Sequence, residues 1–247
     1  CSLCHVCNRH GPSAGTLTSA WHMGWTPWEH LHALFGYEGD DSYELDTRVR
    51  QFYTKAYNRN SGKLMKENPG PDDLSMNGAY PYKFTNYKEA GHSGAEWLIE
   101  QPAYRLSDVY LYLAEAIVRQ DGVTPEAVGL VNDIRARAGL GNDITKNHTS
   151  YYKQRWGSDP TAGKEAFLHL ILWERGRELM GEGQRYEDLR RFNSPDGTNM
   201  LIERAYEQNR ISDKAANAHR VFIPLPHKVV LQSHGIINQN PGYPTTE

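Results

Sequence analysis

Two runs of helical periodicity, with a very short turn between them, set the fold class of this chain. The first run ends at Gly122 and places apolar residues at steps of three and four, on the face that we expect to point into the core: Leu106, Val109, Tyr110, Leu113 and Ile117. Thr124 and Pro125 then fit the cap and the first position of a second helix, which Gly139 ends. The apolar face expected for this second helix consists of Val128, Val131, Ile134 and Ala138. Because the turn is so short, we expect the two helices to be antiparallel neighbours.

A third helix is predicted from about Gly163, with an inward face formed by Phe167, Leu168, Ile171, Leu172 and Leu179. It runs into the stretch WERGRELMGEGQRYEDLRRF, residues 173–192, which holds five acidic residues and five arginines. Acids and bases lie three or four residues apart, so we expect this stretch to pair its own charges: Glu174 with Arg177, Glu178 with Arg175, Glu182 with Arg185, and Glu187 with Arg190 and Arg191. Gly181 and Gly183 break the helix. We interpret the stretch as a scaffold of two helical pieces and not as an active site.

The rest of the chain is rich in turn residues and aromatic side chains. Residues 1–102 mix Gly, Pro, Ser and Trp with little periodicity, which predicts long loops with one short helix from Pro27 to Phe35. Residues 141–162 read as a second aromatic loop, and the chain after residue 195 is polar and irregular up to one brief helix near its end. The expected fold is therefore mainly α, with helical hairpins of the tetratricopeptide kind and long aromatic-rich loops.

Several functional classes lack their signature in this sequence. The net charge is −3 with acids and bases well mixed, so there is no basic stripe of the kind that nucleic acid requires. The H-E-x-x-H, G-x-S-x-G and P-loop patterns are absent, and a single E-x-x-H spacing, Glu29 to His32, is fewer than a di-iron carboxylate site needs. No apolar stretch of about 18 residues predicts a membrane-spanning helix. We predict no catalytic residues, no metal site and no cofactor.

All three cysteines lie within CSLCHVC, the first seven residues, so no disulfide is expected to hold the fold. Cys1, Cys4 and His5 match the C-x-x-C-H pattern of covalent haem attachment. The three thiols, together with His5 or His10, could instead hold zinc. Cys1 could also be the lipid-bearing first residue of a processed lipoprotein. A fourth interpretation is a fragment boundary with idle thiols, and the residues leave these alternatives open.

Three segments resemble the SusD/RagB family in the order in which that family carries them. YRLSDVYLYLAEAIV followed by VNDIRARAGL resembles the family's helical hairpin, ERGRELMGEGQRYEDLRRF is similar to its C-terminal signature, and FIPLPHKVVLQSHGIINQNPGY resembles its closing element. His227 and Lys228 stand where the closing element often has an acidic residue. The matches cover residues 104–243, and AGTLTSAWHMGW with YELDTRVRQFY is more weakly similar to the middle of such proteins. We predict a single SusD-like domain over residues 1–247, loop-rich at 1–102 and helical at 103–247.

The resemblance implies a non-enzymatic lipoprotein on the surface of Bacteroidota-type bacteria, anchored in the outer membrane by a lipid on Cys1. Proteins of this family sit as a lid on a SusC-like TonB-dependent outer-membrane barrel and bind glycans, or in some members peptides, for import. Members are usually longer, which indicates either a shortened member or the C-terminal part of one, and in the second case Cys1 is no lipid site. Two alternatives from other classes are a structural or assembly subunit of an outer-membrane complex and a c-type haem protein through CSLCH.

The family's ligand contacts lie in variable loops, so the candidate binding site rests on chemistry alone. Sugar rings stack on flat aromatic side chains, while polar side chains at the edge bind the hydroxyl groups. Trp21, Trp25 and Trp28, flanked by His22 and His30, fit this description best, although the same tryptophans could pack the loop onto the helices. Weaker candidates are Trp97, Tyr151, Tyr152 and Trp156.

Overall fold

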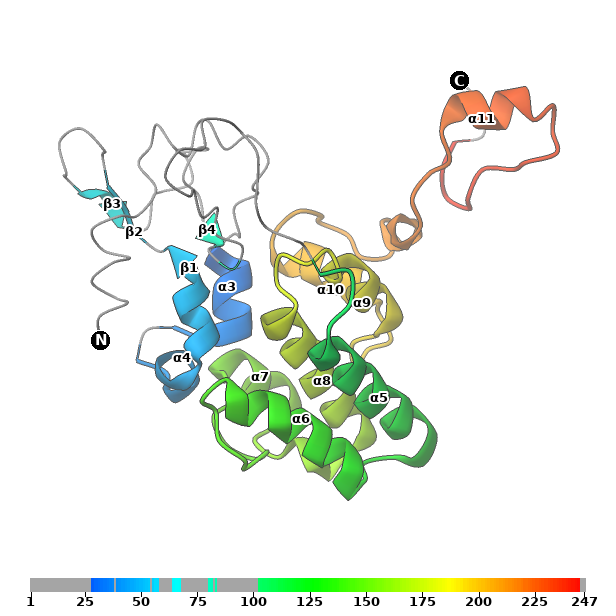
Figure 1. Ribbon diagram of the computed structural model, residues 1–247. Coiled ribbons are helices and arrows are strands. Elements are labelled where there is room, and N and C mark those ends of the chain that lie inside the picture. The colour runs from blue at the N-terminus through cyan, green and yellow to red at the C-terminus, as the bar shows by residue number, and fades with distance from the viewer. Residues whose placement is uncertain are drawn as a thin grey trace. The chain divides into compact units, whose positions relative to one another are not determined.

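The computed structural model describes residues 28–37, 39–53, 55–57, 64–67, 80, 81, 83 and 102–244 (Figure 1). Contacts between residues cluster into two compact units, Cys1–Gly183 and Gln184–Glu247, which we call unit 1 and unit 2. Over the described residues the protein is mainly helical, so the predicted fold class is confirmed. One domain over residues 1–247 stays a prediction.

Unit 1 is built around helix α8 (Lys164–Glu178), in which every residue from Phe167 to Glu178 is buried. A hairpin of α5 (Leu106–Asp121) and α6 (Pro125–Arg137) packs against it, and α5 contacts both α6 and α8 (Figure 1). Helices α3 (Trp28–Phe35) and α7 (Ser150–Trp156) also contact α8. The predicted third helix is therefore the central element of unit 1.

The second helix of the hairpin, α6, begins and ends where its capping residues predict. The Thr124 hydroxyl accepts a hydrogen bond from the backbone N–H of Ala127, and Pro125 is the first residue of α6. Gly139 follows α6 at φ +91°, and a Cβ at this position would lie 2.5 Å from the carbonyl oxygen of Leu45. Glycine is required there both for the backbone conformation and for the close approach of a second segment.

Helix α5 turns the opposite face inward from the one predicted. Its buried residues are Asp108, Leu111, Ala114, Glu115 and Val118. Leu106, Val109 and Leu113 of the predicted inner face are exposed, whereas Tyr110 and Ile117 are half-buried. The helix is apolar on two sides, and a buried ion pair between Asp108 and Arg175 of α8, 2.8 Å long, fixes which side faces α8. The inward face predicted for α6 is confirmed at Val131, Ile134 and Ala138, which are buried.

Both predicted loop regions contain more regular structure than the sequence suggested. The second aromatic loop holds α7, capped by Thr149, and the 3-10 helix η2 (Pro160–Ala162), capped by Asp159. The first loop region holds α3, which begins one residue after the predicted Pro27, and further short elements. These are α4 (Asp41–Leu45), the 3-10 helix η1 (Thr47–Gln51), β1 (Phe52–Tyr53) paired antiparallel with β4 (Tyr80–Pro81), and β2 (Lys55–Tyr57) paired antiparallel with β3 (Leu64–Glu67).

Unit 2 begins with α9 (Arg185–Arg191) and α10 (Met200–Glu207), which contact each other. The 3-10 helix η3 (Ala218–Val221) contacts α10, and α11 (His227–Gln232) follows it. The sequence prediction missed α10, although its helix buries two of the four apolar core residues of this unit, which are Leu189, Phe192, Met200 and Ile202.

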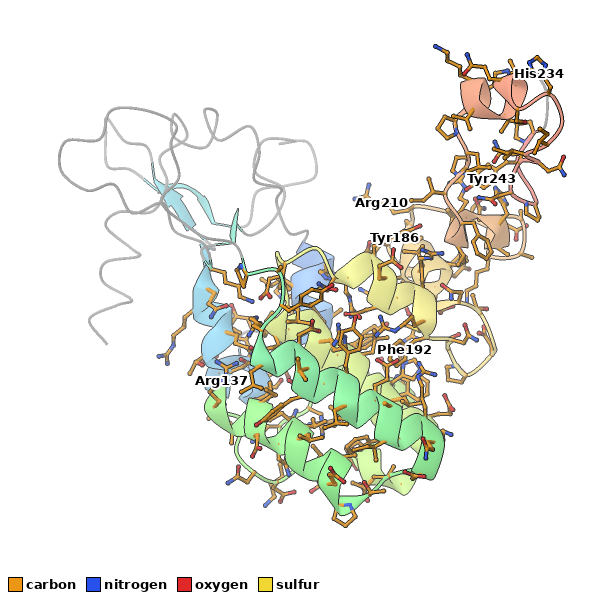
Figure 2. The ribbon with its side chains drawn as sticks, turned by 45° about the vertical axis from the view of Figure 1, so that its right-hand side comes forward. Arg137, Tyr186, Phe192, Arg210, His234 and Tyr243 are labelled. Atoms are coloured by element: carbon orange, nitrogen blue, oxygen red, sulfur yellow. The ribbon has the colours of Figure 1, made fainter. Side chains whose placement is uncertain are left out.

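Residues 205–244, which we call the C-terminal segment, contain no buried side chain. Hydrogen bonds hold the backbone of this segment. The Gln239 side chain bonds both the N–H and the carbonyl of Leu225, at 2.8 and 2.9 Å, and the Tyr243 hydroxyl donates to the carbonyl of Phe222 at 2.7 Å. Figure 2 labels Tyr243 and His234 within it. Hydrogen bonds from polar side chains to the backbone, and not an apolar core, give this segment its conformation.

Over the part of the chain that the structure describes, no helix combines the length and the apolar character that crossing a membrane requires.

Candidate functional site

The residues predicted to bind the ligand lie at or before the start of α3. Trp28 is the first residue of this helix. Trp21 and Trp25 precede it and lie outside the described residues, as does Trp97. Cys1 and the rest of CSLCHVC also lie outside them, so the lipid, haem and zinc interpretations stay predictions. What the structure does establish is how α3, the helix that follows the tryptophan segment, is held in unit 1.

Two side chains of α8 bind the last turn of α3. The indole N–H of Trp173 donates to the carbonyl of Ala33 at 3.0 Å, and Nε of Arg177 donates to the carbonyl of Leu34 at 2.5 Å. These carbonyls belong to the group that a helix leaves unpaired at its C-terminal end. Apolar packing adds to the anchor, because Leu31, Leu34 and Phe35 are fully buried. Since α3 spans only about 12 Å, fixing its last turn also restricts where its first residue lies.

Arg177 is itself part of a buried ion cluster centred on Glu174. The Glu174 carboxylate accepts hydrogen bonds from Arg48 at 2.9 Å, from Arg135 at 2.8 Å and from Arg177 at 2.6 Å. All four side chains are buried. Burial on its own would raise the pKa of Glu174, but the charges of Arg177, Arg48 and Arg135 outweigh it and hold the pKa well below its usual range. Glu174 is therefore ionised in the folded protein at neutral pH.

The cluster extends along α8 through Glu178 and beyond it to Glu182. Glu178 accepts from Arg48 of η1, from Arg105 before α5 and from Arg137 at the end of α6, which Figure 2 labels. Glu182 pairs with Arg105 and Lys83. Burial opposes ionisation of both carboxylates, yet hydrogen bonds from Arg105 and the neighbouring cations lower the pKa of each.

These contacts correct part of the predicted charge pairing. Pairing within the helix holds for Glu174 with Arg177 and for Glu187 with Arg190. Glu178, at the end of α8, and Glu182, beyond it, pair with residues of other segments instead. Two arginines likewise have other partners than predicted: Arg175 pairs with Asp108, and Arg191 pairs with Asp188.

The chemistry of the cluster favours a structural role. Its three glutamates are held ionised, whereas acid–base catalysis needs two groups whose pKa values are pushed apart. Among the described residues, His, Cys, Asp and Glu side chains form no group of three or more that could hold a metal ion. The cluster joins η1, α5, α6 and α8 at one place, and α8 in turn binds α3. It is thus the frame that holds α3, the helix that begins at the candidate residue Trp28.

The weaker candidates on α7 are brought together by the structure, but they are used in packing. Tyr152 is buried, and its hydroxyl donates to the carbonyl of Ala166 at 2.7 Å. The Tyr151 ring stacks on Trp173, with the Arg155 guanidinium 4.9 Å from its centroid. Trp156 stacks on His169 with 3.7 Å between ring centroids. Because these rings are engaged with α8 or with a neighbouring side chain, they favour packing over ligand binding.

Comparison with known proteins adds an independent finding. The sequence model of the SusD family matches residues 29–243. SusD-like protein P2 of Formosa agariphila is 28% identical to this chain over 181 residues, which cover 69% of the chain and 32% of that protein.

Two solved structures are similar in fold. The crystal structure of a SusD superfamily protein from Bacteroides fragilis NCTC 9343 gives a TM-score of 0.52 at 26% identity, over 86% of this chain and 40% of that one. B. fragilis NanU gives a TM-score of 0.53 at 20% identity, over 94% of this chain and 46% of that one, a likeness that shows the fold alone. The chain spans less than half the length of each of these three relatives.

Proposed function

The chain belongs to the SusD family, and from that membership we propose that it binds glycans at a bacterial cell surface for nutrient uptake. The observation that carries this proposal is the family match, which extends over residues 29–243 and so includes both the helical hairpin and the charged frame. We assign the protein no catalytic step, because the buried carboxylates of Glu174, Glu178 and Glu182 are bound to cations that lower the pKa of each.

We place the ligand site at Trp21, Trp25 and Trp28. Indole rings offer the flat apolar surface on which sugar rings stack, and His22 and His30 supply polar groups close by in sequence. The anchoring of α3 supports this assignment, because it fixes the helix that begins at Trp28.

The remaining parts of the proposal follow from the family. The partner is a SusC-like TonB-dependent outer-membrane transporter, and the ligand is an oligosaccharide or, as in some members, a peptide. The protein is anchored in the outer membrane by a lipid on Cys1. An intact mass of the membrane-extracted protein above the 28.1 kDa of the bare chain by one lipid group, mapped to the peptide that carries Cys1, would support the anchor. An unmodified Cys1 would contradict it.

The glycan proposal is tested by affinity electrophoresis in gels that contain soluble polysaccharides, followed by calorimetry with the oligosaccharides of any polysaccharide that retards the protein. We expect Trp25→Ala and Trp28→Ala each to weaken binding about two- to twelvefold, because a stacking contact is worth about 0.5–1.5 kcal/mol. The matched control is Tyr206→Ala, which removes an exposed aromatic ring from unit 2. Far-UV circular dichroism verifies that helical content is unchanged.

Each outcome has a separate meaning. Unaltered glycan binding in both tryptophan variants removes Trp25 and Trp28 from the site but leaves the function in place. A wild-type protein that binds none of the polysaccharides contradicts the glycan proposal, and binding of peptides from a random library would then favour the peptide alternative.

A further inference from the structure

The end of unit 2 forms a loop that closes on itself, residues 219–243, which we call the terminal loop; it contains α11 (Figure 1). Where its ends meet, the His219 and Tyr243 rings lie edge to face with 4.7 Å between their centroids. The Asn240 side chain donates to the carbonyl of Ile223 at 2.7 Å, close in sequence to the hydrogen bonds already described for this part of the chain. Polar side chains of the terminal loop thus serve to bind its own backbone.

Apolar side chains of the terminal loop face solvent. None of its side chains is buried, and Ile236 is 86% exposed and Ile223 67%. Exposed apolar residues usually occur singly, whereas a concentration of them marks a surface that contacts something apolar. Among the described residues, the terminal loop holds six of the fourteen large hydrophobic residues that are exposed: Phe222, Ile223, Val229, Leu231, Ile236 and Ile237.

The charged side chains of the terminal loop are all basic. Arg220 and Lys228 are exposed, and His219, His227 and His234 accompany them. The chain has 30 acidic residues, yet none of them lies within the terminal loop. A surface that combines exposed apolar residues with cations, and has no anion to oppose them, is complementary to a partner that is both apolar and negatively charged.

We propose that the terminal loop inserts into the surface of a membrane that contains anionic lipids. Protein segments at such a surface place basic residues among the lipid phosphates, while their apolar side chains enter about 5–10 Å, to the boundary with the acyl chains. Ile236 and Ile237 provide the apolar part, and Lys228 provides a cation. Backbone groups that leave water must be hydrogen-bonded within the protein, and the closure by side chains contributes to this. The proposal depends neither on glycan binding nor on a lipid at Cys1.

A second copy of this chain fits the terminal loop less well than a lipid surface. A two-fold contact places the same surface patch of both copies face to face. Arg220 and Lys228 of one copy would then approach the same cations of the other, with no acidic residue of the terminal loop between them. Anionic lipid headgroups supply the counter-charge that a second terminal loop lacks.

The first test is cosedimentation of the purified chain with vesicles of phosphatidylcholine that contain about one-third phosphatidylglycerol, and with vesicles of phosphatidylcholine alone. We expect binding to the anionic vesicles only, and weaker binding as added salt screens the charges. Ile236→Gln and Lys228→Gln should each weaken it at least about threefold. The matched controls are Leu106→Gln, which removes an exposed apolar side chain of α5, and Lys153→Gln, which removes an exposed lysine of α7. Neither control should change the binding.

A second measurement tests insertion directly, with an environment-sensitive nitrobenzoxadiazole fluorophore attached through Ile236→Cys in a chain whose three cysteines are replaced by serine. We expect its emission to shift to the blue and to strengthen when anionic vesicles are added. The same fluorophore attached through Asp133→Cys, at an exposed position of α6, should not respond.

Several results would overturn the proposal. They are no binding to the anionic vesicles, equal binding to the neutral ones, equal losses in the control variants, and vesicle binding without a change in emission at position 236. A blue-shifted emission at position 236 without vesicles would also overturn it, because protein would then cover the terminal loop: a second copy if the shift grows with concentration, and this chain itself if it does not. Far-UV circular dichroism verifies helical content in every variant. Ile236→Gln should leave glycan binding unchanged, so that this inference and the glycan proposal can fail separately.

Discussion

Glu174 is the residue at which the buried charges of unit 1 converge. Replacing it by glutamine keeps the shape of the side chain but removes the negative charge, so that Arg48, Arg135 and Arg177 remain buried without their shared counter-charge. Breaking a buried ion pair from one side typically costs 3–5 kcal/mol, because the remaining charge is uncompensated. We therefore expect Glu174→Gln to lower the free energy of unfolding by about 3–5 kcal/mol, as measured by urea denaturation.

Glu187→Gln is the matched control, since it makes the same chemical change on the same stretch of sequence. Its partner Arg190 is within reach at 3.2 Å, but Glu187 is exposed. Exposed pairs contribute little because water screens them, so a loss below about 0.5 kcal/mol is expected. If Glu174→Gln cost no more than Glu187→Gln, the cluster would not be the frame of unit 1.

His148 gives unit 1 a pH dependence that can be measured. It is buried, its Nε2 lies 2.7 Å from the carbonyl of Ile144, and it stacks on Tyr152. Burial, aided by the charge of Arg135, lowers its pKa to about 4. Because the unfolded chain has the higher pKa, near 6.5, it binds the proton first as the pH falls, and stability is lost progressively from about pH 6.5 down to about pH 4.

Between pH 6.5 and 5 this linkage amounts to at most about 2 kcal/mol. The measurement is a series of urea denaturations across that window, which lies above the range where the lowered carboxylate pKa values take effect. His148→Gln cannot titrate, so its stability should vary less with pH by about that amount, whatever its absolute stability. Identical slopes for the two proteins would mean that His148 is not neutral in the folded state.

At the scale of elements, the sequence predicted those helices whose boundaries are set by local chemistry. Thr124, Pro125 and Gly139 mark the two ends of α6 as expected. Helix α8 was predictable because it contains a long apolar run, and its residues are buried on every side from Phe167 to Glu178. The rotation of α5 could not be predicted, because its two apolar sides differ mainly in what covers them. The hydrogen bonds that hold α3 could not be predicted either. Trp173 and Arg177 donate to backbone carbonyls, and every residue has one, so the sequence does not indicate which carbonyl is bound.

Replacing a glycine by alanine is expected to have opposite effects on stability at two positions, Gly139 and Gly129. Gly139 has φ +91°, and a Cβ would lie 2.5 Å from the Leu45 carbonyl oxygen, so Gly139→Ala should destabilise unit 1 by about 2 kcal/mol or more. Gly129 lies inside α6 with nothing within 4 Å of an added Cβ, and Gly129→Ala should stabilise by about 0.5–1 kcal/mol. Thermal unfolding of both variants checks this. A loss of stability for Gly129→Ala would contradict the geometry of α6.

At the scale of the whole molecule, the two units differ in how they are stabilised. Unit 1 has a helix buried on all sides and an ion cluster that ties four elements together. Unit 2 has a small core in its first part, and its C-terminal segment, residues 205–244, has none. Local stability follows the density of buried contacts, so the segments of one chain can open with very different free energies. The family fold was predictable from three sequence segments, but this difference was not, because helical periodicity does not reveal what a helix packs against.

Hydrogen exchange with mass spectrometry measures the difference directly. We expect the amides of α8 to exchange only when unit 1 unfolds, and those of the C-terminal segment to exchange through local opening, at least about a hundredfold faster. Gln239→Ala removes the clamp on Leu225 and should accelerate exchange in the C-terminal segment without changing α8, whereas Glu174→Gln should do the reverse. Equal protection of both regions in the wild type would contradict this, because it would require a cover for the C-terminal segment that the described residues of unit 2 do not provide.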